Sequence, residues 1–163
     1  MMSGSETTPR QAVAYAIADI VPHAGAMCLL DRALDGDADN LGCEVTIPQD
    51  GLFCHDGGVG NWVGMEYMAQ AVAAWAGWQA RLRGERPKVG FLLGSRRFEC
   101  TRAQFKPGEL LRVEVHRVYQ ADNGLGQFDC RIQMAGETVA SATLTVFEPK
   151  DAAAYLQTGA TGE

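Results

Sequence analysis

The chain has 163 residues, 47% of them hydrophobic, and carries a formal net charge of -6 at pH 7. This length and apolar content fit one domain with one sizeable core and make a second domain improbable. The acidic balance argues against a nucleic-acid-binding protein, which would normally carry a basic face.

The N-terminal segment, Met1 to Arg10, is polar, and we expect flexible tails over it and over residues 158–163. It lacks the basic flank and apolar run of a secretory signal. No later stretch has the roughly 18 uninterrupted apolar residues of a membrane span. We therefore expect one cytoplasmic domain over residues 1–163, with no membrane partner.

Short elements are predicted in the first third of the chain. A short helix from Gln11 to Ile20 should end before Pro22, because proline disfavours helical geometry in the residue that precedes it. A brief apolar run covers Leu29 to Leu34. From Cys43 to Ile47 apolar and polar residues alternate, which predicts a half-buried strand stopped by Pro48.

One long helix is predicted from about Asn61 to Arg83, after the glycine-rich loop Gly51 to Gly60. The segment is rich in strong helix formers, and its basic C-terminal residues complement the helix dipole. Its middle is apolar on almost every face, so most of its surface must be buried.

The last third of the chain reads as strands joined by turns, followed by a short helix beyond Pro149. The predicted strands are Val89 to Cys100, Leu111 to His116, Phe128 to Met134 and Thr138 to Phe147, with turns at Pro107-Gly108, Asn123-Gly124 and Ala135-Gly136.

Together the predicted elements indicate an α+β architecture with one strand, a long buried helix and at least four antiparallel strands. An antiparallel sheet wrapped around the central helix would bury that helix on most faces, which is the arrangement of the hotdog fold.

Five scattered cysteines without a Cys-x-x-Cys pair fit reduced core thiols and predict no metal site. They are Cys28, Cys43, Cys54, Cys100 and Cys130.

Four motifs resemble the 3-hydroxyacyl-carrier-protein dehydratases of fatty-acid synthesis. The segment Glu66-Tyr67-Met68-Ala69-Gln70 is similar to the Glu-x-x-Ala-Gln helix motif of that family. The other three stand in the order that the family shows. They are Pro22-His23 before Leu29-Leu30-Asp31-Arg32, then Val89-Gly90-Phe91, and then Phe105-Lys106-Pro107-Gly108-Glu109.

The chain resembles the dehydratase-like subunit of aryl polyene biosynthesis more closely still. Two segments carry this resemblance: Trp62-Val63-Gly64 before Glu66, and the later segment Gly90 to Arg97. The resemblance covers roughly His23 to Val146. It implies that the chain removes water from a 3-hydroxyacyl thioester to give the 2-enoyl thioester. It also implies no cofactor of the chain's own, because an acyl carrier protein presents the substrate on phosphopantetheine.

Independently of the family resemblance, Glu66 is unusual because it lies on an otherwise apolar helix. An unpaired ionised carboxylate costs several kcal/mol to bury, so Glu66 must be paired, neutral or open to a cavity. Gln70 lies four residues on, on the same helical face, where its amide can orient Glu66 or hold a substrate group. A buried carboxylate capped by its neighbours is the alternative.

In the family, a histidine of the loop before the helix abstracts the α proton, and a helix acid of the other subunit protonates the leaving hydroxyl. The resemblance assigns these roles to His55 and Glu66. However, His55 is closer to Glu66 in sequence than in active dehydratases, and Gly60-Asn61 replaces their Pro-Gly. A surface histidine is the alternative for His55.

The resemblance implies further substrate contacts. A backbone N–H at the helix start, near Gly64, stabilises the enolate oxygen in the family. Trp62 is near enough to line an acyl tunnel, with core or dimer packing as its alternative. His23 resembles a position near the substrate entrance, and a structural histidine with satisfied hydrogen bonds is its alternative.

A local basic cluster stands out in the acidic chain: Arg96, Arg97, Arg102 and Lys106. An acidic carrier protein would dock on such a patch, although an ordinary solvated strand face has the same composition.

Two other functions are compatible with the sequence. The chain can be a non-catalytic hotdog subunit that supports an active partner, or a hotdog thioesterase whose helix carboxylate activates water. In each case we expect a homodimer or a heterodimer with a second hotdog subunit, in which the strand from Val89 to Phe98 lies close to its counterpart.

Overall fold

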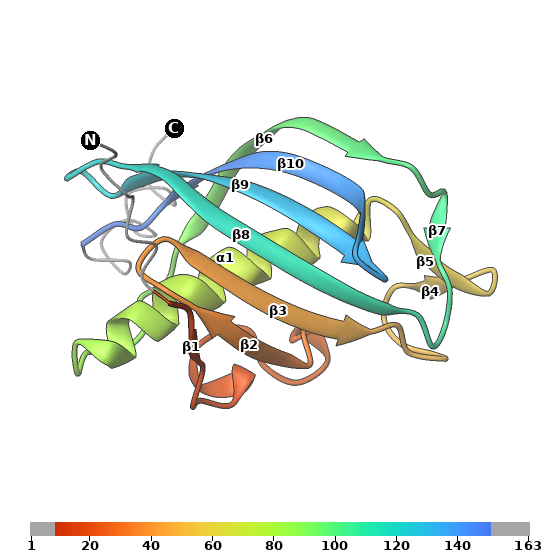
Figure 1. Ribbon diagram of the computed structural model, residues 1–163, viewed down its shortest axis with the longest axis horizontal. Coiled ribbons are helices and arrows are strands. Elements are labelled where there is room, and N and C mark those ends of the chain that lie inside the picture. Colours follow the sequence, from red (N-terminus) through yellow and green to blue (C-terminus); the bar gives the residue numbers. More distant parts are fainter. Residues whose placement is uncertain (1–8, 151–163) are drawn as a thin grey trace, which may run out of the picture.

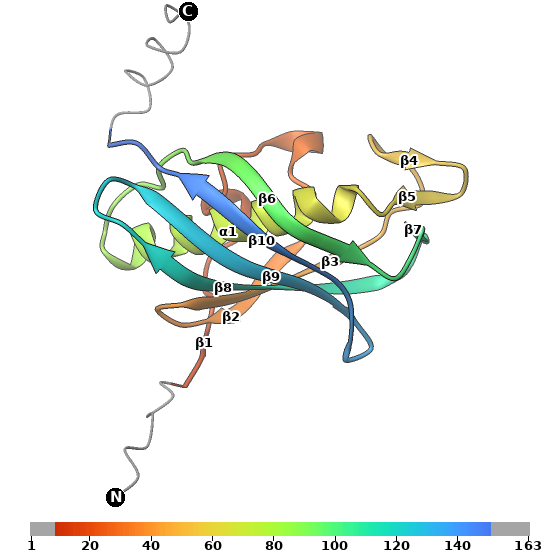
Figure 2. The same cartoon turned by 90° about the horizontal axis from the view of Figure 1, so that it is seen from above.

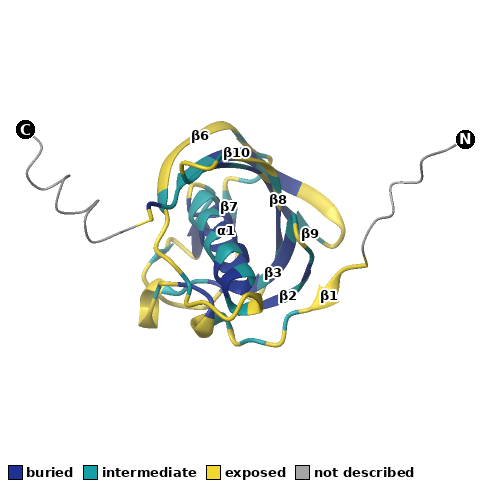
Figure 3. Cartoon of the chain, turned by 90° about the vertical axis from the view of Figure 1, so that its left-hand side faces the viewer, coloured by how far each residue is buried: buried dark blue, intermediate teal, exposed yellow. Residues whose placement is uncertain are grey.

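A long antiparallel sheet curls around one helix (Figure 1). The computed structural model describes residues 9–150. Seven strands form the large sheet in the order β1-β2-β3-β8-β9-β10-β6, and a small sheet contains β4-β5-β7. In an end view the large sheet arches around the helix, which confirms the predicted α+β hotdog arrangement (Figure 3).

The elements have the following bounds. The large sheet contains β1 (Gln11–Ala12), β2 (Arg32–Gly36), β3 (Asn40–Thr46), β6 (Phe91–Cys100), β8 (Leu110–Gln120), β9 (Leu125–Met134) and β10 (Glu137–Phe147). The small sheet contains β4 (Cys54–His55), β5 (Gly58–Gly60) and β7 (Gln104–Phe105). The helix is α1 (Val63–Leu82), and two 3-10 turns are η1 (Ile17–Asp19) and η2 (Gly25–Met27).

The predicted strands and turns of the last third are confirmed. Leu125–Met134 alternates between buried and more exposed residues, as a strand with one face on the core must. Gly124, Ala135 and Gly136 have positive φ angles of 97°, 50° and 82°, which tight hairpin turns require. The helix predicted beyond Pro149 and the tail over residues 158–163 lie outside the described residues.

The helix predicted from Gln11 to Ile20 is wrong. Gln11–Ala12 pairs with β2 instead, and only Ile17–Asp19 forms a helical turn. An isolated helix of ten residues is marginal in water, so tertiary contacts decide the conformation. Here the backbone bonds to β2, and Ile20 and Val21 are buried.

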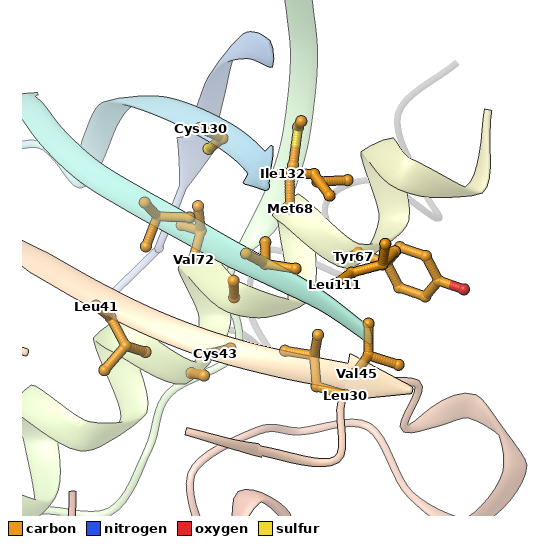
Figure 4. Packing of buried hydrophobic residues seen from close by; sticks show 14 of the residues in the cluster. Leu30, Leu41, Cys43, Val45, Tyr67, Met68, Val72, Leu111, Cys130 and Ile132 are labelled. Atoms are coloured by element: carbon orange, nitrogen blue, oxygen red, sulfur yellow. The ribbon is translucent and has the colours of Figure 1, made fainter. Parts of the chain in front are cut away.

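The core forms between α1 and the concave face of the sheet (Figure 4). Tyr67, Met68 and Val72 of α1 meet Leu111 and Ile132 of the sheet, and all five are buried. The long helix is therefore covered on this side, as its apolar composition predicts.

All five cysteines are free, as expected for reduced core thiols. Burial raises the pKa of the Cys43 thiol to about 12 and also raises that of the Cys130 thiol, so both remain protonated. Among residues 9–150 no three metal-ligating side chains converge, and no helix is long and apolar enough to cross a membrane.

Residues 13–30, which we name the strap, cross α1 on the side away from β8 and β9 (Figure 2). The crossing is close at Gly77, where an added Cβ would lie 1.8 Å from the backbone oxygen of Ile20. Nearby, the Arg81 side chain donates to the Asp19 backbone oxygen at 3.1 Å. Only glycine therefore lets the strap lie against the helix at this point.

We predict that Gly77→Ala lowers the stability of the protein. The added methyl group forces the strap away from α1, and such overpacking costs about 1–3 kcal/mol even after the helix propensity gained from alanine. The thermal midpoint should fall by about 2–12 °C in calorimetry. Gly94→Ala is the matched control, since nothing lies within 4 Å of its Cβ position; equal midpoints for both variants would contradict the close crossing.

One edge of the large sheet is β6, which within residues 9–150 pairs with β10 alone and exposes Leu92 and Leu93 to 43% and 52%. An apolar sheet edge without a partner strand promotes pairing with another chain. We therefore predict a dimer by light scattering at micromolar concentration. Leu93→Lys should weaken that dimer, whereas Val118→Lys, at an equally exposed position on β8, should leave it intact.

A monomer at micromolar concentration, in the absence of any added protein, would contradict self-pairing through β6. It would leave pairing with a different hotdog chain as the alternative.

Candidate functional site

A cavity of about 340 Å³ lies between α1, the strap and the beginning of β6. Its size is within the range of small-molecule sites. Ala69, Ala73 and Ala76 follow one face of α1 and leave space along the helix, while Trp75 and Phe128 form part of the apolar wall. These two aromatic rings pack edge to face, with centroids 5.4 Å apart. The polar side chains of its lining are His23, Glu66, Lys88, Gln120 and Glu148.

Gln70 holds Glu66 in place. The Gln70 side chain is fully buried and uses its amide completely: the oxygen accepts from the Leu29 N–H at 2.9 Å, and the nitrogen donates to the Met27 oxygen at 2.7 Å. The same nitrogen donates to Glu66 Oε1 at 3.1 Å. The two backbone bonds determine the direction of the amide, so Glu66 always receives a donor. The predicted orienting role of Gln70 therefore agrees with the geometry.

His23 faces Glu66 from the strap. Its Nε2 lies 3.8 Å from Glu66 Oε1, within ion-pairing distance but too far for a direct hydrogen bond. The side chains are partly open, with 27% exposure for His23 and 37% for Glu66. His23 Nδ1 is buried without a hydrogen-bond partner among the described residues.

His55 lies elsewhere. It ends the short strand β4, pairs with Gly58 across a tight turn, and is exposed. The turn residues Asp56 and Gly57 have φ angles of 51° and 78°, so the loop folds back on itself before the helix begins. His55 does not line the cavity, and within residues 9–150 it forms no ion pair. The structure of this one chain does not bring the predicted pair His55 and Glu66 together.

Neither Trp62 nor Gly64 lines the cavity. Trp62 is 61% exposed and packs edge to face against Phe53, with ring centroids 5.6 Å apart. Gly64 is buried, and an added Cβ would lie 3.1 Å from the Ile132 side chain. Its N–H already donates to the Asn61 oxygen at 2.9 Å, so it is not free to stabilise an enolate oxygen. In the single chain neither residue therefore lies at this cavity.

The basic cluster is smaller than the sequence predicts. Arg102 donates two hydrogen bonds to Glu109, at 2.8 and 2.6 Å, and its guanidinium helps to hold the pKa of that carboxyl below its usual range. Arg102 is therefore neutralised within the chain. Arg96, Arg97 and Lys106 remain exposed, and Arg97 has a φ of 55° beside a register shift between β6 and β10.

The cavity wall was not predicted. Its alanines recur three or four residues apart from Glu66 onward, which is the spacing of one helical face. No periodicity in the sequence predicts that His23 lies near Glu66, because their proximity depends on how the strap crosses α1.

Comparisons with known proteins agree with this fold. A family model described as ApeP-like, ApeP dehydratase, matches residues 15–157. The structure of the dehydratase heterocomplex ApeI:P from Xenorhabdus doucetiae is similar over 88% of this chain and 96% of that chain, with 27% identity and a TM-score of 0.81. No curated protein matches the chain.

Two more distant structures share the fold alone. One is a hypothetical thioesterase with coenzyme A from Streptococcus pneumoniae TIGR4, with 14% identity, a TM-score of 0.57 and coverage of 72% of this chain and 84% of that chain. The other is the E. coli PaaI protein of the phenylacetic acid degradation operon, with 14% identity, a TM-score of 0.56 and coverage of 71% and 81%.

Proposed function

The chain belongs to the ApeP-like dehydratase family, and we propose that it removes water from 3-hydroxyacyl thioesters carried on the phosphopantetheine of an acyl carrier protein. The product is the 2-enoyl thioester, as needed in fatty-acid or polyene synthesis. The observation that carries the proposal is Glu66, which the buried Gln70 amide holds at a largely apolar cavity.

Glu66 is suited to protonate the leaving hydroxyl. Dehydration breaks the C3–O bond, and the oxygen leaves readily only if it receives a proton. The partly exposed carboxyl of Glu66 can reach a substrate, and the Gln70 amide occupies only Oε1. Because that amide is held by two backbone groups, the carboxyl keeps one orientation during the reaction.

The shape of the cavity supports an acyl substrate. From Glu66 to Ala76 its helical wall extends about 15 Å at 1.5 Å rise per residue. Alanine side chains form that wall, with Trp75 and Phe128 beside it. An apolar groove of this length binds an extended hydrocarbon chain, while the thioester end lies near Glu66.

The partners we propose are a second hotdog subunit and a carrier protein. The similar structure from Xenorhabdus doucetiae is a heterocomplex, and the exposed β6 edge offers this chain a place for such a subunit. Arg96 and Arg97, exposed on β6, provide the basic surface for an acidic carrier protein.

We predict that Glu66→Gln lowers dehydration by about 100-fold or more, because the variant keeps the size of the side chain but has no proton to donate. Thermal stability should stay level or rise. The readout is formation of 2-enoyl thioester by the full chain, alone and with a second hotdog subunit. Glu85→Gln, exposed beyond the end of α1, is the control and should retain full activity.

Three outcomes of this experiment oppose the proposal in different ways. Full activity of a Glu66→Gln complex would make the chain a non-catalytic subunit. Release of free thiol from an acyl thioester, without an enoyl product, would indicate a thioesterase. Equal activity losses in both variants would show that the effect is not specific to Glu66.

We further predict that reversing both Arg96 and Arg97 to Glu weakens carrier-protein binding by about tenfold or more at low salt, and less at high salt. Thermal stability should hardly change, because both side chains are exposed. Calorimetric titration at two salt concentrations measures the effect. Arg131→Glu, on the outer face of β9, is the control; a collapse of the melting temperature in the double variant would instead make these arginines structural.

A further inference from the structure

We propose that His23, on the strap of the same chain, is the base that removes the C2 proton of the substrate, in place of the loop histidine His55. The inference rests on the proposed dehydration and names a second catalytic residue for it. It depends on the position of His23 beside Glu66, on the way the strap is anchored, and on the distance of His55 from the cavity.

The strap holds His23 between two fixed points. On one side the Ile20 backbone lies against Gly77 of α1, at a distance that tolerates no Cβ. On the other side the Gln70 amide bonds to both Met27 and Leu29. His23 lies between these anchors in the sequence, so its imidazole is positioned over the same helix that carries Glu66.

His23 presents one ring nitrogen to the site. One ring nitrogen, Nδ1, is buried and has no partner among the described residues, and the other faces Glu66 at 3.8 Å. The imidazole also lines the cavity in which the acyl chain would lie.

The two side chains suit an elimination across adjacent carbons. In the elimination, neutral His23 takes the proton from C2, the electrons of that bond form the C2–C3 double bond, and the C3–O bond breaks. The departing oxygen takes the proton of Glu66 and leaves as water. After this step His23 is an imidazolium cation and Glu66 is a carboxylate.

Both side chains are partly exposed, so solvent can carry the proton across the 3.8 Å gap and restore the site. Transfer of one proton from the His23 imidazolium to the Glu66 carboxylate returns both groups to their starting forms. The C2 hydrogen has then replaced the proton that left with the water, so the balance closes without an outside acid or base.

The experiment separates proton abstraction from elimination. Wild type, His23→Gln, His55→Gln and Glu66→Gln are compared as full chains, alone and with a second hotdog subunit. Turnover is measured with a 3-hydroxyacyl thioester. Exchange of C2 hydrogen for deuterium in heavy water is measured with a saturated acyl thioester without the 3-hydroxyl group, which requires the base but no leaving-group acid.

We expect His23→Gln to lose about 100-fold or more of both turnover and exchange, as removal of a general base does. Glu66→Gln should lose turnover but keep exchange within about threefold. His55→Gln should keep both. In His23→Ala, added imidazole should restore part of the exchange, which a purely structural role of His23 would not allow.

A readout independent of activity tests the contact itself. The ¹H–¹⁵N signals of the His23 imidazole should shift in Glu66→Gln and stay unchanged in Glu85→Gln. Unchanged His23 signals in both variants would contradict the pairing.

Two results distinguish the ways in which the inference can fail. Normal exchange and turnover by His23→Gln, or loss of both in His55→Gln, would overturn the role of His23 and leave the dehydratase proposal standing. Absence of turnover and of exchange in the wild type, with and without a second hotdog subunit, would overturn the proposed function and this inference together.

Discussion

The buried amide of Gln70 is the interaction on which the site depends. A primary amide has two donors and one acceptor group, and here the backbone groups of Met27 and Leu29 and the carboxylate of Glu66 use them. The amide thus joins the strap to the helix and orients the acid in one contact. If it were replaced by an apolar group, two backbone groups would lose their partner and Glu66 its orientation.

The histidine next to Glu66 comes from the strap and not from the loop before α1. The loop before α1 is taken up by the tight β4–β5 hairpin, whose turn at Asp56 and Gly57 leaves His55 exposed and away from the cavity. The strap instead brings His23 to Glu66 from a segment that precedes the first long strand of the sheet. One fold can therefore place a similar pair of side chains from different parts of the chain, because the central helix is accessible from more than one side.

The large sheet buries only part of the apolar surface of α1. The concave sheet covers Tyr67 and Met68, while the alanine face of α1 lines the cavity and is only partly buried. The β6 edge beside that cavity is also apolar and exposed. Within residues 9–150, part of this apolar helix therefore stays uncovered.

The sequence by itself determined the long helix, the late strands with their turns, and the pairing of Glu66 with Gln70, because each depends on spacing along a few neighbouring residues. Only the tertiary structure decided that residues 11–20 form a strand and a turn, that Arg102 is neutralised by Glu109, and that His23 rather than His55 faces Glu66. These outcomes depend on contacts between segments distant in sequence. Such contacts follow from how the strap packs on α1 at Gly77 and Gln70, which no local periodicity encodes.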